Sequence, residues 1–381
     1  MRQRLGIYLH IPFCERKCAY CDFLSAPAGR EVQRAYVEAL KQEIRQSRET
    51  EGRWEVSTVF FGGGTPSVLP GDWIGEILEE LRACFVFLEG AEITAECNPG
   101  TVDREKLEHY RKAGINRLSM GLQSADNQEL RLLGRIHTWE EFLENFYLAR
   151  ELGFGNINVD LMSALPGQRR EDWRETLEKV IALAPEHISA YSLMVEEGTP
   201  FYEWYGEGKS REGELPEEET ERQMYYDTGR MLKRAGYGRY EISNYARPGF
   251  VCRHNLSYWE RTDYKGFGIG AASLLKEVRS RNHGDLDAYL NGDFSCESIQ
   301  VLSRKEQLEE TMFLGLRKMA GVALTEELLR VYKEVFRDLE GKGLLVRRDG
   351  HAVLTERGID VSNYVLAEFL LDGDVPERDA E

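Results

Sequence analysis

One pattern repeats six times in the first half of this 381-residue chain: a short β-branched or aromatic run, a loop of Gly, Pro or Asn, and a helical segment. The runs are nearly continuously apolar in places, as parallel strands covered on both faces require. Six strand–helix units predict an α/β fold with right-handed crossovers. A full TIM barrel needs eight, so we expect an open, partial (β/α)6 barrel, with a doubly wound sheet as the alternative. The runs are Gly6–Ile11, Thr58–Phe61, Glu92–Glu96, Arg117–Leu122, Asn156–Leu161 and His187–Leu193.

The segments between these runs carry apolar residues at helical spacing. Tyr36, Leu40 and Ile44 recur every four positions after the first run, which predicts a helix that packs one face on the sheet. Asp72 and Asp103 stand where the N-caps of later helices belong, because a carboxylate there can accept hydrogen bonds from free N–H groups.

A stretch rich in Gly, Glu and Pro follows the sixth run, and we end the barrel domain, residues 1–215, within it. Residues 216–299 are interpreted as an extension that completes the core. This extension is predicted to contain a helix near Pro216–Ala235 and short strands around Tyr240–Tyr245 and Gly266–Leu275.

Residues 300–381 form a third predicted unit. Two helix faces are followed by a β-hairpin between Gly343 and Leu354 and by a final helix, an order typical of a winged-helix-like α+β domain. Residues 301–381 hold twelve Lys and Arg against seventeen Asp and Glu, so the DNA-binding role of many such domains is not expected. The two faces are Leu308, Met312, Phe313 and Leu316, then Leu328, Leu329, Tyr332 and Phe336.

Net charge and cysteine content exclude two classes of protein. A formal net charge of −17 argues against binding along a nucleic-acid backbone, where phosphates need clustered Lys and Arg. We find no secretory signal and no run of eighteen apolar residues. Seven cysteines, an odd number in a long chain, indicate metal or redox chemistry and not a secreted disulfide framework, so we expect a cytoplasmic protein.

The strongest local signal is a C-x3-C-x2-C motif formed by Cys14, Cys18 and Cys21 directly after the first run. A four-iron cluster normally takes one thiolate on each iron. Three cysteines on one loop can hold three irons and leave the fourth open, as a ligand-binding metal site requires. A structural zinc site is the alternative, but zinc sites usually have C-x2-C pairs, and no second pair exists here. The spacing therefore favours an iron–sulfur cluster.

Polar residues follow several predicted strands, and the active sites of (β/α) barrels lie at the carboxyl ends of the strands. The second strand ends in Gly62–Pro66, where glycines let a ligand approach the backbone closely. Glu96, Gln123 and Asp160 lie at or near the ends of the next three strands and can hydrogen-bond a hydroxyl or an ammonium group. Arg135 can pair with a carboxylate. A turn, a helix cap or a solvated charge is the structural alternative for each.

The cysteine motif, with Tyr20 before its third cysteine, resembles the signature of the radical SAM superfamily. In that superfamily S-adenosylmethionine (SAM) chelates the open iron of a [4Fe–4S] cluster on a partial barrel. Further motifs resemble the HemN/HemW branch, and the resemblance covers nearly the whole chain: YLHIPFC (8–14), FGGGTP (61–66), ECNP (96–99), SMGLQ (119–123) and DLMSALP (160–166). By position, the resemblance implies cofactor contacts at Tyr8, Tyr20, Gly63, Gly64, Thr65, Glu96, Gln123, Arg135 and Asp160.

Two features separate the members of this branch, which contains an oxygen-independent coproporphyrinogen III oxidase and a haem chaperone. The oxidase motif has a further cysteine where this chain has Phe23, which argues against oxidase activity. Residues 254–259, HNLSYW, resemble the H-N-x-x-Y-W motif of the chaperone. The resemblance therefore implies haem binding in this region, with His254 as a candidate axial ligand and Cys252 as the alternative.

The function implied is that of a haem chaperone on a radical SAM scaffold, with haem, a [4Fe–4S] cluster and SAM as cofactors. The implied partners are haem-acceptor proteins, in this family membrane respiratory enzymes, and an electron donor. These partners imply that the protein is cytoplasmic and that it associates peripherally with a membrane at times. Two alternatives stay open: oxidative decarboxylation of coproporphyrinogen III, and another radical SAM activity such as tRNA modification, which the acidic composition disfavours.

Overall fold

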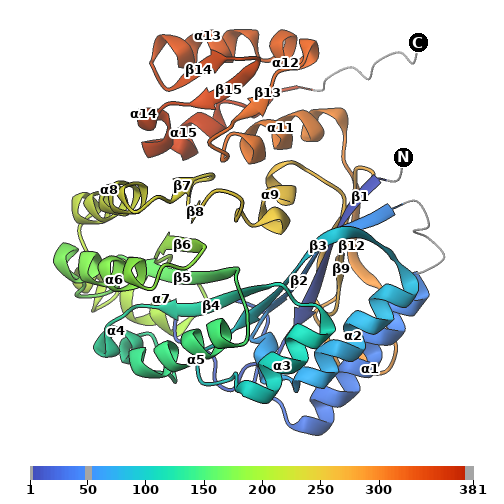
Figure 1. Cartoon of the computed structure of the whole chain (residues 1–381). Coiled ribbons are helices and arrows are strands. Elements are labelled where there is room, and N and C mark those ends of the chain that lie inside the picture. The colour runs from blue at the N-terminus through green and yellow to red at the C-terminus, as the bar shows by residue number, and fades with distance from the viewer. Residues whose placement is uncertain (1–2, 48–53, 374–381) are drawn as a thin grey trace.

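The computed structural model describes residues 3–47 and 54–373 (Figure 1). Six parallel strands lie side by side in chain order: β1 (Gln3–Ile11), β2 (Trp54–Gly63), β3 (Val86–Cys97), β4 (Arg117–Gln123), β5 (Ile157–Ser163) and β6 (His187–Ser192). Because the strand order never reverses, right-handed crossovers put every connecting helix on the same face of the sheet. A doubly wound sheet needs a reversal, so the partial barrel is confirmed and the doubly wound alternative is wrong.

The helices that cover the outer face are α1 (Arg30–Gln46), α2 (Gly71–Cys84), α3 (Arg104–Ala113), α4 (Asn127–Leu132), α5 (Trp139–Glu151) and α6 (Arg170–Ala182) (Figure 1). Tyr36, Leu40 and Ile44 of α1 are fully buried, as their spacing predicted. Asp103 caps α3 by accepting from the Lys106 backbone N–H at 2.8 Å. The prediction for Asp72 is wrong: α2 follows Pro70, so Asp72 lies inside the first turn. Short turns at η2 (Pro66–Val68), α7 (Pro200–Tyr205) and η3 (Glu212–Glu214) complete the loops.

Residues 218–301 extend the sheet at both edges. They form α8 (Glu218–Arg234), β7 (Gly238–Arg239), β8 (Asn244–Ala246), α9 (Arg253–Trp259), β9 (Tyr264–Phe267), β10 (Ala272–Leu275), β11 (Val278–Asn282), α10 (Leu286–Leu290) and β12 (Cys296–Val301). Strand β8 pairs antiparallel with β6, and β9 pairs parallel with β1. In the described part of the chain the sheet therefore has the order β12-β11-β10-β9-β1-β2-β3-β4-β5-β6-β8-β7.

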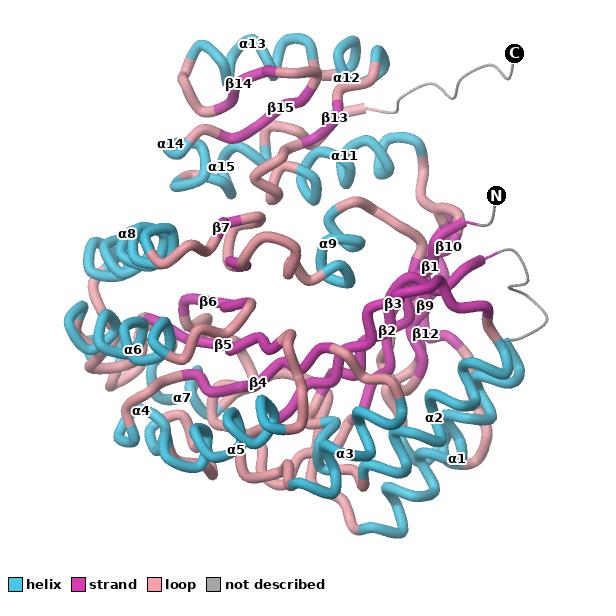
Figure 2. Tube along the Cα trace, viewed as in Figure 1, coloured by secondary structure: helices cyan, strands magenta, loops and turns pink. Residues whose placement is uncertain are grey.

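Helix α9 lies across the amino-terminal part of the barrel, between the strands and the C-terminal domain (Figure 2). The side chain of Glu92, in the middle of β3, accepts from the backbone N–H groups of Arg253 and His254 at 3.1 and 3.0 Å. A carboxylate from another strand thus satisfies the free N–H groups at the start of α9. The cysteine motif follows the carboxyl end of β1, so α9 and that motif lie at opposite ends of the strands.

The C-terminal domain has a core of its own, built around Leu308, Met312, Phe336 and Phe369. Its elements are α11 (Arg304–Gly315), β13 (Val322–Ala323), α12 (Glu326–Val331), α13 (Lys333–Gly341), β14 (Leu345–Arg348), β15 (His351–Leu354), α14 (Glu356–Asp360) and α15 (Ser362–Ala367). The predicted hairpin is present as β14 and β15, with β13 as a third strand. The second predicted helix and the final one are each divided into two short helices, and Leu329 points partly to solvent.

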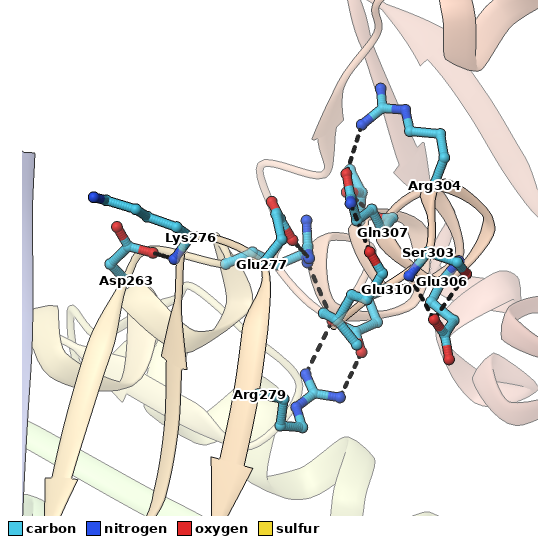
Figure 3. A network of polar contacts seen from close by, with 12 residues as sticks. Asp263, Lys276, Glu277, Arg279, Ser303, Arg304, Glu306, Gln307 and Glu310 are labelled. Atoms are coloured by element: carbon cyan, nitrogen blue, oxygen red, sulfur yellow. Dashed lines mark hydrogen bonds and ion pairs between the residues drawn. The ribbon is translucent and has the colours of Figure 1, made fainter. Parts of the chain in front are cut away.

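A polar network joins the sheet to α11 (Figure 3). The carboxylate of Glu310 accepts two hydrogen bonds from Arg279, at 2.6 and 3.0 Å, and one from Arg261 at 3.2 Å. Arg261 also pairs with Glu277. These contacts connect β11 and the turn after α9 to the first helix of the C-terminal domain. None of the helices in the described ranges is long and apolar enough to cross a membrane.

Candidate functional site

The cysteine loop and the glycine loop are held together by backbone contacts. The N–H of Gly64 donates to the Ile11 carbonyl at 2.8 Å, and that of Thr65 donates to the Phe13 carbonyl at 2.7 Å. A Cβ atom on Gly64 would lie 2.6 Å from the Phe13 carbonyl oxygen, so only glycine permits this approach. The hydroxyl of Thr65 contacts the thiol of Cys14 at 3.5 Å. The glycine loop therefore forms a wall of the cavity that contains the cysteines.

A cavity of about 470 Å3 opens at the carboxyl ends of the strands. Its walls contain eleven of the thirteen predicted site residues: Cys14, Cys18, Cys21, Tyr20, Gly63, Gly64, Thr65, Glu96, Gln123, Arg135 and Asp160. Among the described residues, no three His, Cys, Asp or Glu side chains converge on one point that would hold a single metal ion. The other two predicted residues, Tyr8 and His254, do not line this cavity.

Arg135 lines the cavity next to the cysteine loop. Its guanidinium donates to the thiol of Cys18 at 3.6 Å, to Asn98 Oδ1 at 2.7 Å and to the Gly121 carbonyl at 2.6 Å. Its Nε atom is buried and has no partner among the described protein atoms. A buried donor without a partner costs free energy, so this cation is suited to bind an anionic group of a ligand.

Two carboxylic acids, Glu96 and Asp160, line the cavity and lie near each other. Burial, followed by the nearby Asp160, raises the pKa of Glu96 to about 8. Burial also raises the pKa of Asp160, although hydrogen bonds from Asn158 and Ser119 oppose this. At neutral pH, Glu96 is therefore ready to ionise when a cation binds beside it.

Gln123 ends β4 with a φ of 73°, in the left-handed region that a residue with a side chain seldom adopts. The pairing of β4 with β5 shifts by one residue between Gly121 and Gln123. This bulge turns the Gln123 side chain into the cavity wall. Backbone strain of this kind is usually found at binding sites.

Tyr8 lies within β1 and is not among the residues that line the cavity. The Tyr8 hydroxyl lies 3.2 Å from His10 Nδ1, and its ring stacks on Phe60. Burial raises the pKa of Tyr8, and the charge of Glu96 raises it further. The structure therefore places Tyr8 next to the site and not in its wall.

His254 is enclosed by protein. Only 1% of its surface is exposed, its ring stacks on Phe60, and its nitrogens lie 2.8 Å from Thr58 Oγ1 and 2.9 Å from the Tyr258 hydroxyl. Cys252 is fully buried beside Glu92. In this conformation neither candidate haem ligand is reachable from the surface, so axial ligation by either stays a prediction that requires α9 to move.

The cavity also contains residues outside the set of predicted contacts. Asn98 orients Arg135, Ser119 bonds to Asp160, and Cys97, Tyr191 and Met194 line the wall. Asn98 and Ser119 belong to the ECNP and SMGLQ motifs, but only Asn98 follows a strand end, since Ser119 is the third residue of β4. Met194 follows β6 with 70% of its surface exposed, and no pattern in the sequence marks it.

Comparisons with known proteins agree with this geometry. Residues 8–180 match the Radical SAM superfamily, and residues 302–361 match the HemN C-terminal domain. The heme chaperone HemW of Bacillus subtilis is 36% identical, over 95% of this chain and 98% of that protein. This chain belongs to the HemW family of radical SAM proteins. The heme chaperone HemW of Escherichia coli is 41% identical, over 70% of this chain and 69% of that protein.

The HemW family shares its fold with the oxidase of the same branch. The solved structure of coproporphyrinogen III oxidase (HemN) from Escherichia coli, a radical SAM enzyme, matches with a TM-score of 0.82 over 97% of this chain and 90% of that one. Its sequence is 24% identical, so the match shows a common fold and does not show a common activity. At the position where the oxidase motif has a further cysteine, Phe23 lines the cavity with 61% of its surface exposed.

Proposed function

We propose that this protein is a haem chaperone that holds a [4Fe–4S] cluster on Cys14, Cys18 and Cys21 and binds SAM at the open iron of that cluster. The observation that carries the proposal is that the three thiols, the glycine loop and the polar strand ends line the same cavity. The donor set fits such a group, because thiolates are the usual ligands of iron–sulfur clusters.

The ligand groups of SAM have suitable partners in the same wall. The Gly62–Pro66 loop and Glu96 are proposed to take the ammonium group, and Arg135 the carboxylate. Gln123 and Asp160 are proposed to accept from the ribose hydroxyls, with Tyr20 beside the adenosyl group and Tyr8 supporting Glu96. SAM on a reduced cluster is a source of radical chemistry, and in this chain the surrounding side chains would orient it and exclude water.

Haem binding and its delivery to acceptor proteins are proposed from the family, whose curated members are named heme chaperones. We propose that the acceptors are membrane respiratory enzymes, that an electron donor serves the cluster, and that the protein works in the cytoplasm. For haem to reach His254 or Cys252, α9 would have to leave its place against β2 and β3.

The experiment starts with anaerobic reconstitution of the full chain. We expect about four irons and four sulfides per chain, and a change in the EPR signal of the reduced cluster when SAM is added. A variant with Cys14→Ala, Cys18→Ala and Cys21→Ala should lose the iron. The matched control carries Cys84→Ala and Cys296→Ala, which lie outside the cavity, and should keep it.

Haem and coproporphyrinogen III are then added to separate samples. A Soret band at one haem per chain, without decarboxylation of coproporphyrinogen III, supports the chaperone. Turnover of coproporphyrinogen III would instead favour the oxidase. A native chain that binds no haem would contradict the proposal.

A further inference from the structure

A chain of hydrogen bonds runs through the barrel interior, away from the cavity. Asp160 Oδ1 accepts from Asn158 Nδ2 at 2.8 Å, and Asn158 Oδ1 lies 2.5 Å from His187 Nδ1. His187 Nε2 lies 2.8 Å from the hydroxyl of Tyr240. Asn158 and Asp160 point to the same face of β5, and His187 is the first residue of the neighbouring β6. The chain thus connects the carboxyl end of the barrel with its amino end.

The hydrogen bonds of this chain have one direction. Burial, followed by the charge of Arg117, lowers the pKa of His187 well below its usual value, so the imidazole is neutral and has one N–H. Asn158 Oδ1 also accepts from Ser189 Oγ at 3.1 Å and can only accept, so the proton of His187 is on Nδ1. The bare Nε2 must then accept from the Tyr240 hydroxyl. Every donor therefore points toward the carboxylate of Asp160.

The two ends of this series of hydrogen bonds, Tyr240 and Asp160, are held differently. At the far end, the backbone of Tyr240 is fixed, because its carbonyl accepts from the N–H of Met319 in the C-terminal domain at 2.9 Å. At the near end, each oxygen of Asp160 takes one bond from the protein, from Asn158 and from Ser119. A carboxylate has about four acceptor positions, so two or so are left for a ligand. Asp160 lines the cavity and can present them there.

We propose that His187 and Tyr240 are positioning residues for the ligand of the cavity: through Asn158 they fix Asp160 as an acceptor for vicinal hydroxyl groups, as on a ribose. Neither side chain lines the cavity, and His187 is fully buried. The proposal rests on the proposed binding of SAM. It differs from a purely structural role because removal of either residue would weaken ligand binding more than it disturbs the fold.

The test measures the dissociation constant of SAM by equilibrium dialysis on the reconstituted full-length protein. His187→Leu removes both contacts and should weaken binding about tenfold or more. In His187→Asn the amide nitrogen can take the place of Nδ1 and donate to Asn158, so this variant should recover most of the affinity. Tyr240→Phe should weaken binding less. Tyr237→Phe is the matched control, a buried tyrosine whose hydroxyl donates to the Pro185 carbonyl at 2.7 Å, and it should bind SAM as the native chain does.

A double-mutant cycle decides whether the effect passes through Asp160. In an Asp160→Ala background, His187→Leu should have little further effect on SAM binding, because the acceptor that it orients is already gone. Native affinity in both His187→Leu and Tyr240→Phe would overturn the proposal while leaving SAM binding intact. Equal losses in Tyr237→Phe and Tyr240→Phe would also overturn it. Failure of the native chain to bind SAM would instead show that the proposed function is wrong.

Discussion

Arg135 donates to the carbonyl oxygen of Gly121 at 2.6 Å, in a space that any side chain at position 121 would fill. A Cβ atom there would lie 2.9 Å from Asn98 Oδ1 and 3.4 Å from a terminal nitrogen of Arg135. The glycine of the SMGLQ motif thus has a steric role, since it admits the guanidinium beside the cysteine loop.

Gly121→Ala is therefore expected to displace Arg135 and Asn98 and to weaken SAM binding by about five- to fiftyfold, as the loss of one charge-assisted hydrogen bond would. Equilibrium dialysis of the reconstituted protein measures this. Gly155→Ala is the control, because a Cβ at Gly155 meets nothing within 4 Å. If both variants bind SAM like the native chain, Arg135 is not held by this contact.

The affinity for SAM is expected to rise with pH up to about 8. Glu96 has a pKa of about 8, so below that pH most of it is protonated and must lose its proton to pair with an ammonium group. Titrations between pH 6.5 and 8.5 test this. Glu96→Gln should bind more weakly and show only the pH dependence of the ligand itself. Identical pH profiles for the two proteins would exclude Glu96 from this role.

His137 and His254 are expected to make a destabilising contribution to the fold as the pH falls below 6.5, opposite in sign to that of Glu96, whose pKa is raised. Burial, followed by the charge of a nearby arginine, lowers the pKa of both His137 and His254 to about 3, whereas these residues take up a proton near 6.5 when unfolded. The unfolded state binds more protons between these values, so each residue costs up to about 1.4 kcal/mol per pH unit there. Urea unfolding at pH 7, 6 and 5 measures the slope.

His254→Gln should make that slope shallower, since glutamine does not titrate. An unchanged slope in His254→Gln would mean that α9 is not docked in solution, which would reopen the route of haem to His254.

Glu310 is expected to anchor the C-terminal domain. Glu310→Gln leaves Arg261 and Arg279 without their charged partner, and we expect it to lower the free energy of unfolding by about 1–2 kcal/mol, since Arg279 is partly exposed. Hydrogen exchange of the α11 amides should become faster. Glu297→Gln, which breaks a pair with Arg281 in which both side chains are largely exposed, should change neither quantity. An equal response in both variants would argue against an anchoring role.

Much of the barrel and of the cavity could be predicted because its signals are local. The six runs became six parallel strands, and Cys14, Gly64, Glu96, Gln123 and Asp160 lie around one cavity because carboxyl ends of parallel strands meet at one end of a barrel. Hydrophobic periodicity and strand-end positions depend on neighbours within a few residues, which a single sequence contains.

The surroundings of the HNLSYW segment were decided by the tertiary structure alone. His254 bonds to Thr58 across 196 positions of the chain, and Tyr240 meets His187 across 53. The sequence of the segment would be the same whether it were exposed to a haem or packed against β2. The sequence by itself determined the strands, the cysteine loop and the polar strand ends. The burial of His254 depends on how β9, α9 and the C-terminal domain pack against the barrel, because exposure results from contacts between distant segments and no local spacing encodes them.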